Sequence, residues 1–222
     1  MMDVETKFQA IDNNIRQACE RSNRNPEEIT LIAVTKYVTI ERTIETVQAG
    51  IENLGENRME GFLEKYDAVQ DVTWHFIGTL QSRKVKEVID KVDQLHSLDR
   101  KSLAKEINKR RDIPLDCFVQ VNVSGEESKH GLSLENVLPF IQDMASYENI
   151  RIVGLMTMAP HVEDEETIRT VFRKLRELRD TIQEKKWEHA PCEYLSMGMS
   201  NDYEIAIEEG ATHIRIGTQL VG

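Results

Sequence analysis

The feature that most constrains the fold of this chain is a regular alternation of short apolar runs with stretches of helical periodicity. Residues 31–34, Leu-Ile-Ala-Val, form a continuous apolar run of the kind found in strands that are buried on both faces. Between such runs, apolar residues recur every three or four positions, as in amphipathic helices, most clearly over residues 168–182. Seven further short runs follow the first, at residues 53–55, 74–77, 94–98, 117–123, 152–158, 194–197 and 214–216.

Eight strands that alternate with helices predict an α/β fold, a (β/α)8 TIM barrel of parallel strands. Residues 4–19 carry a separate amphipathic pattern, which predicts an extra N-terminal helix before the first strand. Pro139 lies inside the helix expected after Ser133, and the pattern leaves open whether it bends or begins that helix. Since no linker interrupts the chain, we expect a single domain over residues 1–222. Counting strands does not prove closure, so an open doubly wound sheet is the alternative.

The composition argues against several classes of protein. The formal net charge of −11 disfavours nucleic-acid binding, which needs a basic surface. No apolar run approaches the ~20 residues of a bilayer-spanning helix, and the polar N-terminus does not resemble a signal peptide. The three cysteines are widely spaced and lack a C-x-x-C motif, so we expect reduced thiols and a cytoplasmic protein. The six histidines show no paired spacing, so we expect no metal site.

The first candidate for chemistry is Lys36, which follows the apolar run 31–34 almost directly. Parallel barrels place their active sites at the carboxyl ends of the strands, where this lysine is expected. Burial there would lower the pKa of the ammonium from ~10.4 and leave an amine that attacks carbonyl groups. Position alone is equally compatible with a surface lysine at the start of a loop.

The second candidate region is formed by the segments that follow the seventh and eighth predicted strands. Barrels often bind phosphate between these two loops, through amides at the start of a helix. Gly217 would let the backbone approach a phosphate, and Ser200 and Thr218 would offer hydroxyl groups. Each segment alone also fits an ordinary turn with a helix cap. Their occurrence at the two expected strands of one barrel favours the phosphate site.

Six segments of the chain, taken in order, resemble the pyridoxal-phosphate homeostasis protein family. The likeness runs from about residue 4 to the C-terminus, and the block 74–84, WHFIGTLQSRK, is its most specific part. The resemblance implies a barrel similar to that of alanine racemase, which binds pyridoxal 5′-phosphate (PLP) in the same way. The segments are AVTK at 33–36, LGEN at 54–57, WHFIGTLQSRK at 74–84, GLMTM at 154–158, LSMGMSND at 195–202 and RIGT at 215–218.

The resemblance also implies roles for individual residues. Lys36 matches the lysine that forms a Schiff base with the cofactor aldehyde, and Arg215 matches the arginine that faces the pyridine nitrogen. A cup for the cofactor phosphate is matched by Ser200, Gly217 and Thr218.

Four further residues are expected near the cofactor. Asn57 and His75 fall at predicted strand ends, so we expect both to line the pocket. Met156 and Met158 share one face of a predicted strand, which lies either against the cofactor ring or within the core.

Two functions are compatible with such a pocket: carriage, buffering or supply of PLP, as the resemblance implies, and amino-acid racemisation. An arginine beside the pyridine nitrogen disfavours ring protonation and weakens the electron sink that most enzymes with this cofactor use. Racemisation needs a second proton carrier opposite Lys36. In alanine racemase this is a tyrosine from a separate C-terminal domain, which we expect to be missing because the barrel consumes all 222 residues. We therefore expect a PLP-homeostasis protein without a complete catalytic apparatus.

A third reading, a cofactor-free Schiff-base aldolase, is less favoured because barrel aldolases usually place their lysine on a later strand. The expected partners are PLP and apo-enzymes that need it. We expect a monomer that binds neither nucleic acid nor membranes.

Overall fold

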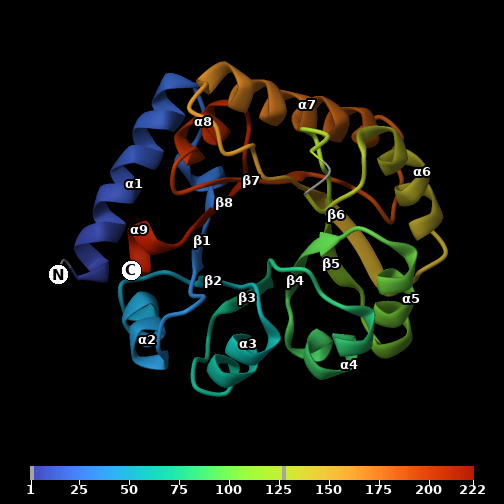
Figure 1. Cartoon of the computed structure of the whole chain (residues 1–222), viewed down its shortest axis with the longest axis horizontal. Coiled ribbons are helices and arrows are strands. Elements are labelled where there is room, and N and C mark those ends of the chain that lie inside the picture. Colours follow the sequence, from blue (N-terminus) through green and yellow to red (C-terminus); the bar gives the residue numbers. More distant parts are fainter. Residues whose placement is uncertain (1–2, 127–128) are drawn as a thin grey trace.

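The computed structural model describes residues 3–126 and 129–222, and eight parallel strands form a closed barrel within them. Figure 1 shows the strands as an inner ring with the helices outside it. The strands are β1 (Thr30–Val34), β2 (Asn53–Glu56), β3 (Thr73–Phe76), β4 (Gln94–Leu98), β5 (Leu115–Gln120), β6 (Ile150–Met156), β7 (Tyr194–Met199) and β8 (His213–Ile216). Each pairs with its neighbour in sequence, and β8 pairs with β1.

Most of the helices cross from one strand to the next. The α-helices are α1 (Val4–Arg21), α2 (Ile40–Gln48), α3 (Met59–Tyr66), α4 (Val85–Val88), α5 (Lys101–Arg110), α6 (Leu134–Met144), α7 (Glu165–Gln183), α8 (Tyr203–Glu208) and α9 (Thr218–Val221). Short 3₁₀ turns cover Pro26–Glu28, Ser82–Lys84 and Ile89–Lys91. The extra N-terminal helix α1 packs against α8 and α9. None of the described helices is long and apolar enough to cross a membrane.

The register between the first and last strands closes the barrel. Thr30 lies opposite His213 and Ala33 lies opposite Ile216, with the two intervening pairs in step. The predicted (β/α)8 barrel is thereby confirmed and the open doubly wound sheet is excluded, because an open sheet leaves its first and last strands unpaired with each other. Pro139 lies in the interior of α6, so it does not begin that helix.

The fifth and sixth strands end earlier than the apolar pattern predicts. β5 ends at Gln120 rather than at 123, and β6 ends at Met156 rather than at 158. Val121 and Val123 are still buried, but the chain has left the sheet there, and Val121 forms only an isolated bridge to Leu132. Apolar content alone therefore does not distinguish a strand from a buried loop that follows it.

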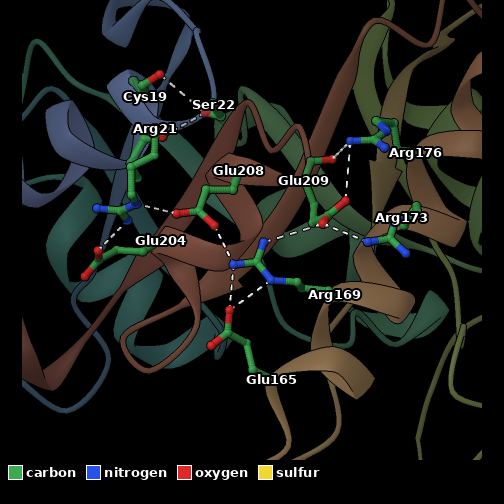
Figure 2. Close-up of polar contacts among 11 residues, drawn as sticks. Cys19, Arg21, Ser22, Glu165, Arg169, Arg173, Arg176, Glu204, Glu208 and Glu209 are labelled. Atoms are coloured by element: carbon green, nitrogen blue, oxygen red, sulfur yellow. Dashed lines mark hydrogen bonds and ion pairs between the residues drawn. The ribbon is translucent and has the colours of Figure 1, made fainter.

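Helix α8 is held between α1 and α7 by a network of ion pairs (Figure 2). Glu208 accepts from Arg21 of α1 at 2.6 Å and from Arg169 of α7 at 2.5 Å. Glu209, at the end of α8, contacts Arg173 at 3.2 Å and also lies within 3.5 Å of Arg169. Exposed ion pairs are each worth only ~0.2–1 kcal/mol, but these share partners across three helices. The network holds the helix that directly follows the loop after β7.

Candidate functional site

A cavity of about 360 Å³ lies at the carboxyl ends of the strands, where parallel barrels carry their active sites. It is bordered by the ends of β1, β2, β3, β5, β6, β7 and β8 and by residues that follow these strands. Six of the seven residues predicted for the site line this cavity: Lys36, Asn57, Ser200, Arg215, Gly217 and Thr218.

Lys36 stands at the rim of the cavity, two residues beyond the end of β1. Its side chain is exposed, so of the two positions that the sequence left open the structure shows the surface one. Lys36 lies in a turn after the strand, which ends at Val34. The Val38 amide closes this turn by donating to the Thr35 carbonyl at 3.2 Å, and Tyr37 adopts a positive φ of 65°. Lys36 also borders a second cavity, of about 760 Å³, on the side facing α2 and α3.

The backbone just before Lys36 is fixed by a buried ion pair. The Nζ of Lys65 lies 2.5 Å from Oε1 of Glu56 and donates to the carbonyl oxygen of Thr35 at 2.7 Å. The Thr35 hydroxyl donates to the same Glu56 oxygen at 2.7 Å. Both charged side chains are almost fully buried, with exposed fractions of 4% for Lys65 and 1% for Glu56. A lysine of α3 and a glutamate of β2 therefore hold the strand end from which Lys36 projects.

Asn57 follows β2 and borders both cavities. Its side-chain oxygen Oδ1 is buried and has no hydrogen-bond partner among the described residues. Buried polar atoms are nearly always paired, so this oxygen is suited to accept from a bound molecule. Gly78 holds the Asn57 backbone closely, because a Cβ at Gly78 would lie 2.0 Å from the Asn57 carbonyl oxygen. The glycine in the WHFIGTL segment is thus required by this contact.

Arg215 projects from β8 into the barrel and reaches the floor of the cavity. One Nη donates to the Ser196 hydroxyl at 2.5 Å, and the other donates to the Thr157 carbonyl at 3.0 Å. Burial lowers the pKa of Arg215 to about 10, against the opposing effect of the Asp202 carboxylate. The guanidinium therefore stays charged at neutral pH and offers N–H groups to the cavity.

The loops after β7 and β8 bring Ser200, Gly217 and Thr218 to one side of the cavity. Gly198, near the end of β7, has a positive φ of 93°, and a Cβ there would lie 2.6 Å from the Cβ of Ala206, so only glycine fits this position. Asp202 closes the loop by accepting from the Met199 amide at 2.6 Å, and burial raises its pKa. At Gly217 a Cβ would meet only Val34, at 3.8 Å or more, and would project into open space beside the cavity.

His75 does not line the cavity, which corrects the expectation for this residue. Its ring is fully buried inside the barrel, and its Nε2 lies 2.9 Å from Oδ1 of Asn53 at the start of β2. The residue stands one position before the end of β3, where the alternation of the strand directs it into the barrel below the cavity floor. Burial, with a smaller effect of His213, lowers its pKa to about 3.

Sequence reasoning missed several residues that line the cavity. Gln120 ends β5, and His130 belongs to the long segment between β5 and α6. Neither carries a motif, and only the closure of the barrel brings them to the site. Met156 and Met158 both line the cavity, and Met156 also packs with Phe118 and Val153 in a small cluster inside the barrel. Met156 therefore lies both at the cavity and in the apolar interior, and its contact with a cofactor ring stays a prediction.

The family described as "Alanine racemase, N-terminal domain" matches residues 7–222. A pyridoxal phosphate homeostasis protein of Aquifex aeolicus is 44% identical, over 100% of this chain and 98% of its own length. The Escherichia coli K12 protein of the same name is 34% identical over 100% and 97%. The chain belongs to the pyridoxal phosphate homeostasis protein family.

Solved structures share the fold of this chain. An unknown protein of Bifidobacterium adolescentis superposes with a TM-score of 0.92 at 33% identity, covering 98% of this chain and 94% of its own. PipY of Synechococcus elongatus, solved with PLP bound, gives a TM-score of 0.80 at 28% identity, covering 94% and 100%. An alanine racemase of Clostridium difficile shares the fold at 13% identity, with a TM-score of 0.79 over 98% of this chain and 56% of that one.

The buried pair beneath Lys36 generates a stability prediction. Lys65→Met leaves the Glu56 carboxylate buried without its partner, which typically costs ~3–5 kcal/mol of the free energy of unfolding. The double variant Lys65→Met/Glu56→Gln carries no unpaired charge and should recover most of this loss. Urea unfolding measures the free energy of unfolding of the single and the double variant. The control is Lys91→Met, whose exposed amine lies 3.8 Å from Asp67 and should cost less than ~1 kcal/mol. Equal losses of the free energy of unfolding in Lys65→Met and Lys91→Met would contradict the assignment of a buried ion pair to Lys65 and Glu56.

Proposed function

We propose that this protein binds PLP as a Schiff base on Lys36 and carries, buffers or supplies the cofactor in the cell, without being an enzyme that uses it. The observation that carries the proposal is the convergence of an amine, a buried guanidinium and two hydroxyl-bearing loops on one cavity, from Lys36, Arg215, Ser200 and Thr218. The names of the relatives and the PLP-bound structure of PipY support the same ligand.

The residues of the cavity fit the chemical groups of PLP. The unpartnered Oδ1 of Asn57 can accept a hydrogen bond from a ligand. The open space beside Gly217 can admit a ligand group, because glycine has no side chain to fill it. Ser200 and Thr218 supply hydroxyl donors for a phosphate, beside the start of α9. The cavity of about 360 Å³ lies within the usual range for small-molecule sites. We assign the phosphate to the loops after β7 and β8 and the pyridine ring to the side of Arg215.

Each of these groups would have a separate role toward the cofactor. Lys36 would hold the cofactor aldehyde through its side-chain amine. Arg215, which stays charged at neutral pH, would donate toward the pyridine nitrogen and oppose its protonation. The cofactor, when bound, would supply an electron-accepting ring, and a ring whose nitrogen is unprotonated is a weaker electron sink. The arrangement favours holding the cofactor over using it.

Within the cell we place the protein in the cytoplasm as a monomer that delivers PLP to apo-enzymes. The three cysteines are free and buried, as reduced thiols are in a reducing compartment. The exposed position of Lys36 at the rim leaves the attachment point accessible from the barrel mouth, which suits exchange of the cofactor.

The alternative function, amino-acid racemisation, has one observation in its favour. His130 lines the cavity together with Lys36, so an imidazole is available as a second proton carrier. Two tyrosines near strand ends, Tyr37 and Tyr203, do not supply this group. Tyr203 is buried and accepts from Asn14 at 2.9 Å, and Tyr37 is 73% exposed and borders the other cavity.

Solvent exchange separates these two functions. We expect the PLP-loaded protein to exchange the α-proton of alanine for deuterium at the rate of free PLP in the same buffer, as followed by proton NMR. A protein that only carries PLP should give no multiple turnover, because the ring of the bound cofactor is a poor electron sink. Rapid exchange with inversion that is abolished by His130→Gln would instead establish the racemase.

The attachment of PLP to Lys36 is tested by reduction. Purified protein incubated with PLP should be yellow, and borohydride should convert the linkage to a permanent adduct on the peptide that contains Lys36. Lys36→Ala should take up no adduct in the cavity. Mass spectrometry of the digest is decisive because Lys65 also borders the neighbouring cavity. An adduct on Lys65, or on a surface lysine only, would contradict the proposal.

Delivery is tested by reactivation of an apo-enzyme that needs PLP. The loaded wild type should reactivate it more slowly than an equal amount of free PLP, because release from the site limits the rate. Thr218→Val should release PLP roughly tenfold faster or more, since a hydrogen bond to a charged group contributes ~1.5–3 kcal/mol. Thr181→Val is the control, because its hydroxyl bonds only within α7. Equal rates from free and bound PLP would show that the protein does not hold the cofactor.

A further inference from the structure

A continuous chain of hydrogen bonds runs through the interior of the barrel below the cavity. Arg215 of β8 donates to the Ser196 hydroxyl of β7 at 2.5 Å. That hydroxyl lies 2.8 Å from Nδ1 of His96 on β4. Nε2 of His96 lies 2.9 Å from Nδ1 of His75 on β3, and Nε2 of His75 lies 2.9 Å from Oδ1 of Asn53 on β2. The chain crosses the barrel from the cavity floor to its amino end.

The chemistry of the two ends sets the direction of every bond in this chain. A guanidinium has donors only, so the Ser196 oxygen must accept from Arg215. At the other end the amide oxygen of Asn53 only accepts, so a neutral His75 carries its proton on Nε2 and donates it to Asn53. Nδ1 of His75 is then unprotonated and accepts from Nε2–H of His96. A neutral His96 with its proton on Nε2 is unprotonated at Nδ1, which accepts the hydroxyl proton of Ser196.

The surroundings keep both imidazoles neutral. His75, His96 and Ser196 are each at most 1% exposed, and the ring of Phe118 stacks on His96 at a centroid distance of 4.1 Å. Burial lowers the pKa of His96 well below its ordinary value, with further lowering by His75, His213 and Arg215. A proton on Nδ1 of His75 would also face the Nε2–H of His96, so that two donors would meet. The ordered chain therefore persists across the physiological pH range.

We propose that Ser196 and His96, supported by His75, are positioning residues that hold the Arg215 guanidinium toward the cofactor. This rests on the proposed function, because the group that Arg215 faces is the pyridine nitrogen of PLP. With one Nη bonded to Ser196 and the other to the Thr157 carbonyl, the plane of the guanidinium is set by two elements. The chain behind Ser196 prevents its hydroxyl from turning away, since the hydroxyl proton is committed to His96.

The barrel offers a matched control in His213. This histidine is also buried inside the barrel, and its ring centroid lies 6.2 Å from that of His96. Among the residues that the structure describes, its Nδ1 contacts only the hydroxyl of Thr212, at 2.9 Å, so His213 stands outside the chain. A role in packing alone would be shared by His96 and His213, whereas a role in positioning Arg215 belongs to His96.

The first test uses the cofactor-free protein and does not depend on PLP binding. Nitrogen-15 NMR of the histidine side chains should show that His75 and His96 are both neutral and both protonated on Nε2. In Ser196→Ala the His96 resonances should move, while those of His213 should stay in place. A protonated ring, or the opposite tautomer at either His75 or His96, would overturn the proposed chain.

The second test uses the PLP-loaded protein. Ser196→Ala and His96→Phe should each speed PLP release about tenfold, as expected when a charged hydrogen bond is lost or misdirected, and should shift the absorption maximum of the bound cofactor. Ser196→Thr keeps the hydroxyl and should return the release rate and the absorption maximum toward the wild-type values. His213→Phe should change neither the release rate nor the absorption maximum. Thermal melting of the cofactor-free proteins shows whether each variant is folded.

The outcomes separate the two proposals. Equal effects of His96→Phe and His213→Phe, or no effect of Ser196→Ala, would overturn the positioning role. Failure of the wild type to bind PLP, with the tautomers as expected, would overturn the proposed function and with it the orientation of Arg215 toward a cofactor. If His96→Phe does not fold, the comparison of Ser196→Ala with Ser196→Thr decides the matter.

Discussion

The pairing of β1 with β8 is the interaction on which the site depends. It places Ala33 opposite Ile216, so the chain that leads to Lys36 and the chain that leads to Gly217 and Thr218 emerge side by side at one end of the barrel. These residues lie about 180 positions apart in the sequence. Without closure, the amine and the proposed phosphate loops would stand at opposite edges of an open sheet. The ring of helices, and the ion pairs that hold α8 between α1 and α7, maintain this arrangement from outside (Figures 1 and 2).

The interior of the barrel is unusual in its polarity. Barrel interiors are commonly filled with branched apolar side chains, yet here three histidines, a serine and an arginine lie inside: His75, His96, His213, Ser196 and Arg215. A buried polar group that lacks a partner costs ~1–3 kcal/mol, so such an interior is stable only when each group is paired. The chain from Arg215 to Asn53 satisfies four of these groups with one consistent set of proton positions, and His213 bonds instead to the Thr212 hydroxyl. A buried cation is thereby held at the cavity floor without a carboxylate bonded to it.

Much of the fold and most of the candidate site could be predicted from the sequence. The alternation of apolar runs with helical periodicity indicated the barrel, and the position of Lys36 after the first run indicated the site. The sequence could not show that Lys36 is exposed, because that depends on the turn at Tyr37. It also suggested that His75 lines the pocket, although the ring of this residue is bonded to His96 and Asn53 inside the barrel, below the cavity. The ends of β5 and β6 were missed because buried loops are as apolar as strands.

By itself the sequence determined the order of the elements, the family and the identity of the residues after each strand, because periodicity and motifs are local properties of the chain. Only the tertiary structure decided which of those residues meet. Scattered histidines without paired spacing became neighbours on β3, β4 and β8, and a lysine of α3 joined a glutamate of β2 beneath Lys36. Such contacts arise from barrel closure and strand register, which bring together side chains from distant positions. A buried charge or imidazole is tolerated only where that register supplies its hydrogen-bonding partner.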